Sequence, residues 1–182
     1  DGALAIETLG DAIDATVFGI GTAGLALVKS QVIGTSVSSV NVTGAFSATY
    51  ENYKIVVSGG VSSANCYLQM SLGASTTAYY EFLTYGSFSS NAVAGGGNNN
   101  VTKWQFTGDG AGSQGLYMSV DLLAPQLAKY TRYGTTIAYQ TVAGSGVSSG
   151  IHKDASAYTD FTLSPDSGTL TGGTIYVYGY TK

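Results

Sequence analysis

The stretch SGTLTGGTIYVYGYTK, residues 167–182, combines a run rich in glycine and threonine with a run of strictly alternating side chains. The alternating run places three tyrosines between small or aliphatic residues: Tyr176, Tyr178 and Tyr180 against Ile175, Val177 and Gly179. A period of two is typical of a β-strand with one buried face. We therefore predict that the aliphatic set faces a core. The tyrosine row then lines the opposite face, in water or against a partner.

The same alternation occurs in YKIVVS, residues 53–58, and short runs rich in Val, Ile, Tyr, Phe and Thr continue along the chain from Leu25. Turn residues (Gly, Ser and Asn) separate these runs, and no helical pattern lies between them. About ten short strands spaced in this way predict an all-β fold. We expect an antiparallel β-sandwich of the jelly-roll type over residues 25–182.

Residues 1–24 follow a different pattern. Ile6, Leu9, Ile13 and Val17 recur at helical spacing, with acidic residues on the other face. The segment predicts a short helix or coiled-coil stub for oligomerisation or anchoring, and its Ile and Leu positions are compatible with a trimer. A helix that caps its own domain is the alternative. GIGTAG, residues 19–24, is predicted to be a flexible linker to the β-domain.

Charged residues make up only 10% of the chain, and the formal net charge is −4. Weak charge repulsion favours a protein that is packed against partners. The seven basic residues are scattered, so we expect no nucleic-acid partner. No apolar run approaches about 20 residues, so we expect no membrane insertion.

The sequence offers little for catalysis, and we predict no catalytic, cofactor-binding or metal-binding residues. His152 is the sole histidine and therefore has no second histidine with which to bind a metal. No GxSxG elbow is present, and Asp109 in TGDGAG lacks the further acidic residues of a calcium loop. Nothing in the sequence pairs the remaining carboxylates for glycoside hydrolysis. Cys66, the single cysteine, is expected to be a small buried strand residue.

The long uncharged stretch SSNAVAGGGNNNVT, residues 89–102, is predicted to be a loop. Residues 108–115 and 143–150 are similar in composition. Such loops are either solvated turns or tips that contact a ligand. Four residues in and after the first loop are candidates for binding a surface sugar: Asn98, Asn99, Asn100 and Trp104.

Three stretches carry a resemblance to a known family. They are FSATYENYKI (residues 46–55), LLAPQLAKYTR (residues 122–132) and FTLSPDSGTLTGGTIYVYGYTK (residues 161–182). Together they resemble a module that recurs in virion proteins of tailed bacteriophages, and the resemblance covers residues 25–182. It implies a β-sandwich on the exterior of the particle, as in tail fibres or minor structural proteins. It brings no catalytic residues.

These observations lead to one expected function and two alternatives. The expected function is a non-enzymatic, tail-fibre-type head that forms a homotrimer and contacts other virion proteins of the tail or capsid. It would bind a glycan or protein of the host surface and use no cofactor. The first alternative is a capsid decoration or head-fibre protein. The second is a polysaccharide depolymerase on the same scaffold.

Overall fold

The structure, a computed structural model, describes residues 24–112 and 114–181. The predicted helical stub with Ile6, Leu9, Ile13 and Val17 lies outside the described residues. Within them, every paired strand runs antiparallel to its neighbour.

The described part of the chain contains fourteen β-strands, where the sequence predicted about ten. The first seven are β1 (Leu25–Val32), β2 (Val40–Val42), β3 (Asn52–Ser58), β4 (Val61–Ser62), β5 (Cys66–Leu72), β6 (Tyr79–Ser87) and β7 (Val93–Val101). The others are β8 (Trp104–Ala111), β9 (Gly115–Leu123), β10 (Thr131–Tyr139), β11 (Gly144–His152), β12 (Phe161–Pro165), β13 (Leu170–Thr171) and β14 (Thr174–Tyr180). The additional strands are the two-residue pair β4 and β13 and the nine-residue β7. The prediction of a loop over residues 89–102 is therefore wrong, because β7 occupies most of it.

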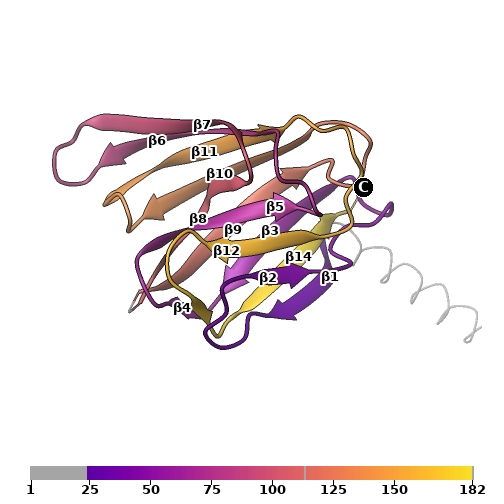
Figure 1. Ribbon diagram of the computed structural model, residues 1–182, viewed down its shortest axis with the longest axis horizontal. Coiled ribbons are helices and arrows are strands. Elements are labelled where there is room, and N and C mark those ends of the chain that lie inside the picture. Colours follow the sequence, from indigo (N-terminus) through magenta and orange to yellow (C-terminus); the bar gives the residue numbers. More distant parts are fainter. Residues whose placement is uncertain (1–23, 113, 182) are drawn as a thin grey trace, which may run out of the picture.

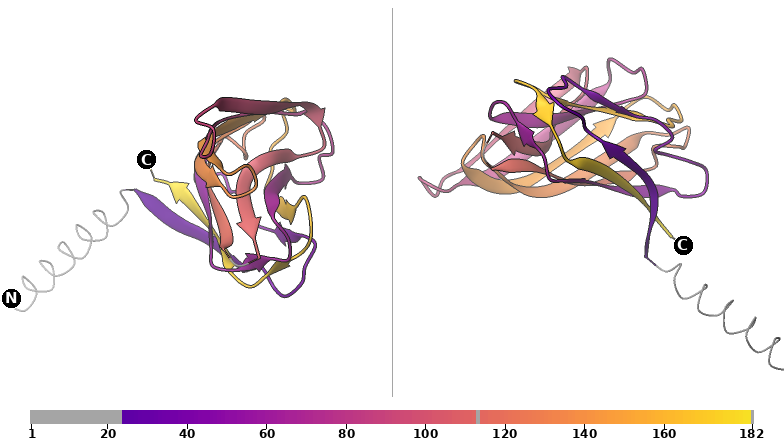
Figure 2. Two further views of the ribbon diagram at one scale, coloured as in Figure 1. Left: turned by 90° about the vertical axis from the view of Figure 1, so that its left-hand side faces the viewer. Right: turned by 90° about the horizontal axis from the view of Figure 1, so that it is seen from below.

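Twelve strands form one hydrogen-bonded network that folds into two facing layers. One layer has eight strands in the order β1-β14-β3-β9-β10-β11-β6-β7, and the other has four in the order β2-β12-β5-β8. The β8–β9 hairpin joins them, since its two strands belong to different layers. Figures 1 and 2 show the arrangement from three sides. The predicted antiparallel β-sandwich is confirmed.

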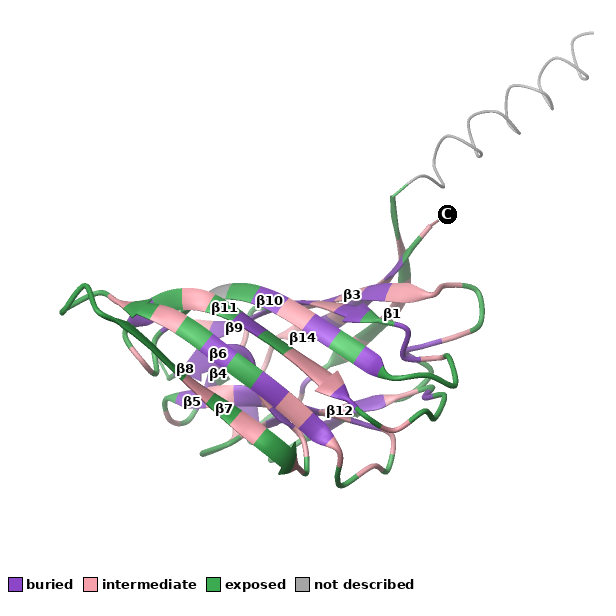
Figure 3. Ribbon diagram, turned by 90° about the horizontal axis from the view of Figure 1, so that it is seen from above, coloured by how far each residue is buried: buried purple, intermediate pink, exposed green. Residues whose placement is uncertain are grey.

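The core fills the space between the layers. Strands of both layers alternate between buried and more exposed residues, as the colours along β6, β10 and β11 show in Figure 3. Ile175 and Val177 are fully buried, whereas Tyr176 and Tyr178 are half-buried on the outer face, so the predicted orientation of this strand is confirmed. Cys66 is also buried, as predicted.

One edge of β9 changes its pairing partner along its length. One edge of β9 pairs with β3, and the other edge pairs first with β8 and then, from Asp121 to Leu123, with β10. Beyond Gly134, β10 leaves β9 and continues beside β11 alone. This separation of β8 and β10 along one edge of β9 is called the fork below.

A buried carboxylate connects the strands on either side of the fork. Glu81 on β6 is only 6% exposed and accepts four hydrogen bonds. Its Oε1 accepts from the backbone N–H of Gln105 at 2.6 Å and from the side-chain amide of Asn98 at 2.8 Å. Its Oε2 accepts from the backbone N–H of Phe106 at 3.1 Å and from the hydroxyl of Tyr133 at 2.7 Å. Glu81 thus replaces the ladder partner that β8 lacks where it is separated from β9.

The bond from Tyr133 depends on a close approach between strands. The Tyr133 ring crosses β11 above Gly150, where an added Cβ would lie 2.5 Å from the ring and 2.7 Å from Trp104 Nε1. Burial, and secondly the charge of Glu81, raise the pKa of Tyr133. The hydroxyl therefore keeps its proton and remains a donor to Glu81.

A second buried carboxylate fixes the turn after β10. Asp109 on β8 is 1% exposed and accepts the backbone N–H of Gln140 at 2.7 Å. It also accepts the hydroxyl of Thr141 at 2.5 Å. Asp109 therefore holds this turn against β8 through hydrogen bonds.

We expect Glu81→Ala to lower the free energy of unfolding by about 3–5 kcal/mol, since several buried donors would lose their acceptor. Glu81→Gln should lose less, because one amide oxygen can still accept. Urea denaturation monitored by fluorescence would measure both. The control is Glu51→Ala, which removes a solvent-exposed ion pair to Lys129 and should cost no more than about 1 kcal/mol. A loss of under about 1 kcal/mol in Glu81→Ala would show that Glu81 does not hold the fork.

Candidate functional site

The register of the eight-stranded layer aligns one row of residues across five strands on its outer face. The row is Lys54 (β3), Asp121 (β9), Gly134 (β10), Ser149 (β11) and Phe82 (β6). It has large or charged side chains at its ends and small ones in the middle. Its span is about 19 Å, or four strand spacings.

Two neighbouring rows form the walls of a depression over this row. One wall consists of Leu123, Arg132, Ile151 and Tyr80, which pair across β9, β10, β11 and β6. The other consists of Ser119, Thr136 and Val147. The hollow on the side of the first wall has a volume of about 640 Å³ and the hollow on the other side about 440 Å³. They share Asp121, Gly134 and Ser149, so we treat them as one site, the transverse groove.

Gly134 forms the open floor of the transverse groove. A Cβ added at this position would have no heavy atom within 4 Å. The absence of a side chain at residue 134 therefore serves no packing need inside the protein. It leaves space above the sheet between the two walls.

Phe82 closes one end of the groove and is 56% exposed. Its ring lies between two glycines of β7, because a Cβ added at Gly97 would be 2.7 Å from ring atom Cδ2 and one at Gly95 would be 3.2 Å from Cε1. The glycines form a notch that positions the ring against the backbone of β7. The exposed remainder of the ring is available as an apolar platform.

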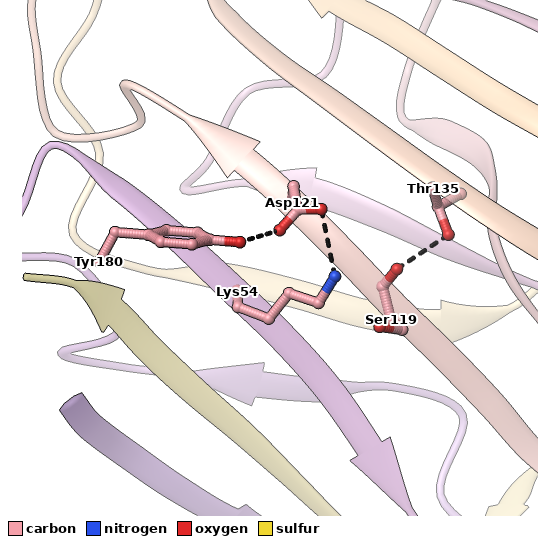
Figure 4. Close-up of polar contacts among 5 residues, drawn as sticks. All are labelled: Lys54, Ser119, Asp121, Thr135 and Tyr180. Carbon is pink, nitrogen blue, oxygen red and sulfur yellow. Dashed lines mark hydrogen bonds and ion pairs between the residues drawn. The ribbon is translucent and has the colours of Figure 1, made fainter. Parts of the chain in front are cut away.

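Asp121 lies at the opposite end, between a tyrosine and a lysine (Figure 4). The Tyr180 hydroxyl donates to Oδ1 at 2.5 Å, and Lys54 Nζ lies 3.1 Å from Oδ2. The hydrogen bond to Asp121, and secondly burial, raise the pKa of Tyr180 to about 12. Tyr180 therefore stays protonated at neutral pH and keeps its bond to Asp121.

One part of the groove lies where β10 has separated from β9. There, the hydroxyl of Thr135 donates to the carbonyl oxygen of Ser119 at 2.9 Å, in place of a backbone ladder bond (Figure 4). In the wall formed by Ser119, Thr136 and Val147, the polar side-chain groups are the hydroxyls of Ser119 and Thr136. At the far end of the fork lies a smaller hollow of about 280 Å³, whose charged lining group, Asp109, is already engaged by the turn after β10.

Within the described residues, the side chains in contact with the sole histidine are mainly aromatic. His152 is buried, its ring stacks on Tyr79 at 4.1 Å, and its Nε2 lies 2.8 Å from the Tyr158 hydroxyl. That hydroxyl donates to Asp154 at 3.0 Å, so Nε2 is the donor to Tyr158. No serine or cysteine side chain hydrogen-bonds to His152 in the described part of the chain. No group of three or more potential metal ligands occurs among residues 24–112 and 114–181.

The candidate binding residues named from the sequence are not assembled into one site. Trp104 is fully buried in the core, so its prediction as a surface-binding residue is wrong. Asn98 is bonded to Glu81, and the side chain of Asn100 accepts the backbone N–H of Ala78. Asn99 is exposed on β7.

Of the binding candidates named from the sequence, Asn98 alone lines the transverse groove, and no sequence pattern indicated the other residues of this site. Phe82 is on β6, whereas Gly134 and Arg132 are on β10, and only the pairing of these strands through β11 brings them to one face. In the sequence, the exposed position of Phe82 is marked solely by its alternation with Glu81 and Leu83. The alternation predicts a face but not which residues lie across from it.

No protein-family model, no curated protein and no solved structure matches this chain. Within the described residues, no helix has the length and apolar character needed to span a bilayer. The transverse groove and the sequence resemblance described above are therefore the basis of the function proposed below.

We expect the stability of the fold to depend on pH through His152. Burial lowers the pKa of His152 below its ordinary value of 6.5, so the unfolded chain binds a proton that the folded chain excludes. The free energy of unfolding should be highest above about pH 6.5 and should fall as the pH is lowered towards 5, by at most about 1.4 kcal/mol per pH unit. Urea denaturation at several pH values would measure this slope.

His152→Phe supplies the control for that experiment, because it retains a ring beside Tyr79 but cannot titrate. Since the chain has a single histidine, the slope between pH 7 and pH 5 should largely disappear in this variant. Equal slopes in the two proteins would show that His152 is not the responsible group.

Proposed function

We propose that this protein is a non-enzymatic head domain on the exterior of a tailed-bacteriophage particle, of the tail-fibre type, and that it binds a host-surface glycan in the transverse groove. One observation carries the proposal. A floor of small residues lies between an exposed aromatic ring, Phe82, and a cluster of polar groups around Asp121. The resemblance to phage virion modules supports the location on the particle.

The chemistry of the groove fits a sugar chain. A pyranose ring has an apolar C–H face, which stacks on an aromatic ring, and hydroxyl groups, which need donors and acceptors. Phe82 and Tyr80 supply the aromatic surface, and Ser149, Ser119 and Thr136 supply hydroxyls. A shallow, open groove accepts an extended oligomer more readily than a small compact ligand.

The carboxylates near the groove support a binding role over hydrolysis. Glycoside hydrolysis needs one carboxyl group as an acid and a second as a nucleophile or base. Both oxygens of Asp121 are engaged, by Tyr180 and Lys54. Both oxygens of Glu81 are engaged by donors of the fold.

The test of the groove is Gly134→Leu, which places a side chain on its floor at a position where the added Cβ has no heavy atom within 4 Å. We expect this variant and Phe82→Ala to lose at least about tenfold in affinity on an array of bacterial surface polysaccharides, which corresponds to 1.4 kcal/mol. Gly86→Leu is the matched control, since Gly86 lies on the outer face of the same layer, has equally open space, and does not line the groove. Binding that is absent in the wild type, or equal in all variants, would refute the proposal.

Strand β1 supports the homotrimer that the sequence predicts. Among the strands that the structure describes, it pairs only with β14, and Leu25 and Leu27 on it are 50% and 58% exposed. They lie opposite Tyr180 and Tyr178 in the β1–β14 register. An apolar edge of this kind is costly to leave in water and can be covered by another copy. We include self-association through this edge in the proposed function.

Replacing both leucines, in Leu25→Ser/Leu27→Ser, should therefore convert a trimer to monomers while leaving the unfolding temperature of the monomer unchanged. Light scattering after size exclusion of the full chain at micromolar concentration would give the mass. Val93→Ser is the control, since Val93 is 80% exposed on β7 at the opposite edge of the layer. A monomeric wild type, or a trimer that survives the double substitution, would contradict this interface.

A further inference from the structure

We propose that the ligand of the transverse groove is an acidic oligosaccharide and that Arg132 binds its negatively charged group. The inference rests on the proposed function and specifies the class of sugar. It comes from the charges of one groove wall, which differ from those of the chain as a whole, where the net charge is −4.

Arg132 is a charged side chain for which the fold provides no partner. Several other cations are engaged: Lys54 with Asp121, Lys129 with Glu51, Lys103 with Ser164 and Lys153 with the ring of Tyr80. The exposed Arg132 makes no hydrogen bond or ion pair with any residue that the structure describes. Its five N–H donors are therefore free to bind a ligand.

The neighbours of Arg132 leave its guanidinium open to a ligand. Its cross-strand neighbours in the groove wall are Leu123 on one side and Ile151 on the other. Neither side chain has a polar group that could accept a hydrogen bond from Arg132. A planar oxyanion, such as a carboxylate, can accept two parallel hydrogen bonds from one guanidinium.

A second cation extends the same wall. Lys153 Nζ lies 4.3 Å from the centre of the Tyr80 ring and forms no ion pair within the described residues. Tyr80 follows Ile151 in the row that contains Arg132. Of the carboxylates near the groove, Asp121 is paired with Lys54, and Glu81 is buried beneath the face with four donors. On the outer side of this wall, Arg132 and Lys153 therefore present two positive charges to an anionic ligand.

A single oligosaccharide can contact both Arg132 and the exposed ring of Phe82. Arg132 on β10 and Phe82 on β6 are two strands apart, about 10 Å across the sheet. A chain of two or more sugars can place one ring on Phe82 and the acidic group of another on Arg132. The open floor at Gly134 and Ser149 lies between them.

Isothermal titration of the full chain with paired probes tests this inference. The pairs are oligogalacturonate and its methyl ester, sialyllactose and lactose, and a sulfated galacto-oligosaccharide and its unsulfated form. We expect at least one acidic member to bind at least tenfold more tightly than its neutral twin. Arg132→Gln should reduce that preference to less than threefold without weakening the neutral twin. Lys129→Gln, which removes a charge outside the groove, should change neither.

The outcomes separate this inference from the proposed function. A preference for the carboxylated or for the sulfated member supports the inference and identifies the anion. Neutral twins that bind as tightly as acidic ones, or a preference that survives Arg132→Gln, overturn it. In those cases glycan binding still stands, provided that Gly134→Leu abolishes it. If neither the acidic nor the neutral probes bind, both proposals fail.

Discussion

The architecture depends on the hydrogen bonds that the buried carboxylate of Glu81 accepts. A strand that leaves its neighbour exposes backbone donors, and in a core these donors must find another acceptor. Glu81 supplies it to β8 and at the same time holds β10 through Tyr133 and β7 through Asn98. The fork between β8 and β10 is stable because of this replacement. The open part of the outer face, where Thr135 bridges to Ser119, is a direct result of the fork.

The two faces of the eight-stranded layer have separate tasks because side chains alternate along each strand. On the inner face, Tyr133 reaches across Gly150 to Glu81 and fixes the strands. On the outer face, one row further along, the residues around Gly134 leave space. Substitutions on the outer face can therefore alter binding without removing the contacts that stabilise the fold. The outer face can therefore vary in sequence while the fold is retained.

The sequence predicted the fold class and the orientation of its clearest strands, because a period of two marks both. It failed at β7, where Gly95–Gly97 and Asn98–Asn100 have low strand propensity, although this segment pairs with β6 and places its glycines against the Phe82 ring. Trp104 was assigned to the binding surface because it follows the predicted loop over residues 89–102, whereas it is buried in the core. The groove could not be predicted at all, since it arises from the pairing of strands that are distant in the sequence.

The glycine notch beneath Phe82 has a consequence for how such a surface can change. The height and tilt of the ring are determined by missing Cβ atoms on β7, not by polar residues in contact with a ligand. A single added methyl group at Gly97 would lift the ring and reshape the apolar end of the site, while every charged and hydroxyl group stayed in place. A one-codon change on β7, outside the residues that line the groove, would thus alter the shape of its apolar end.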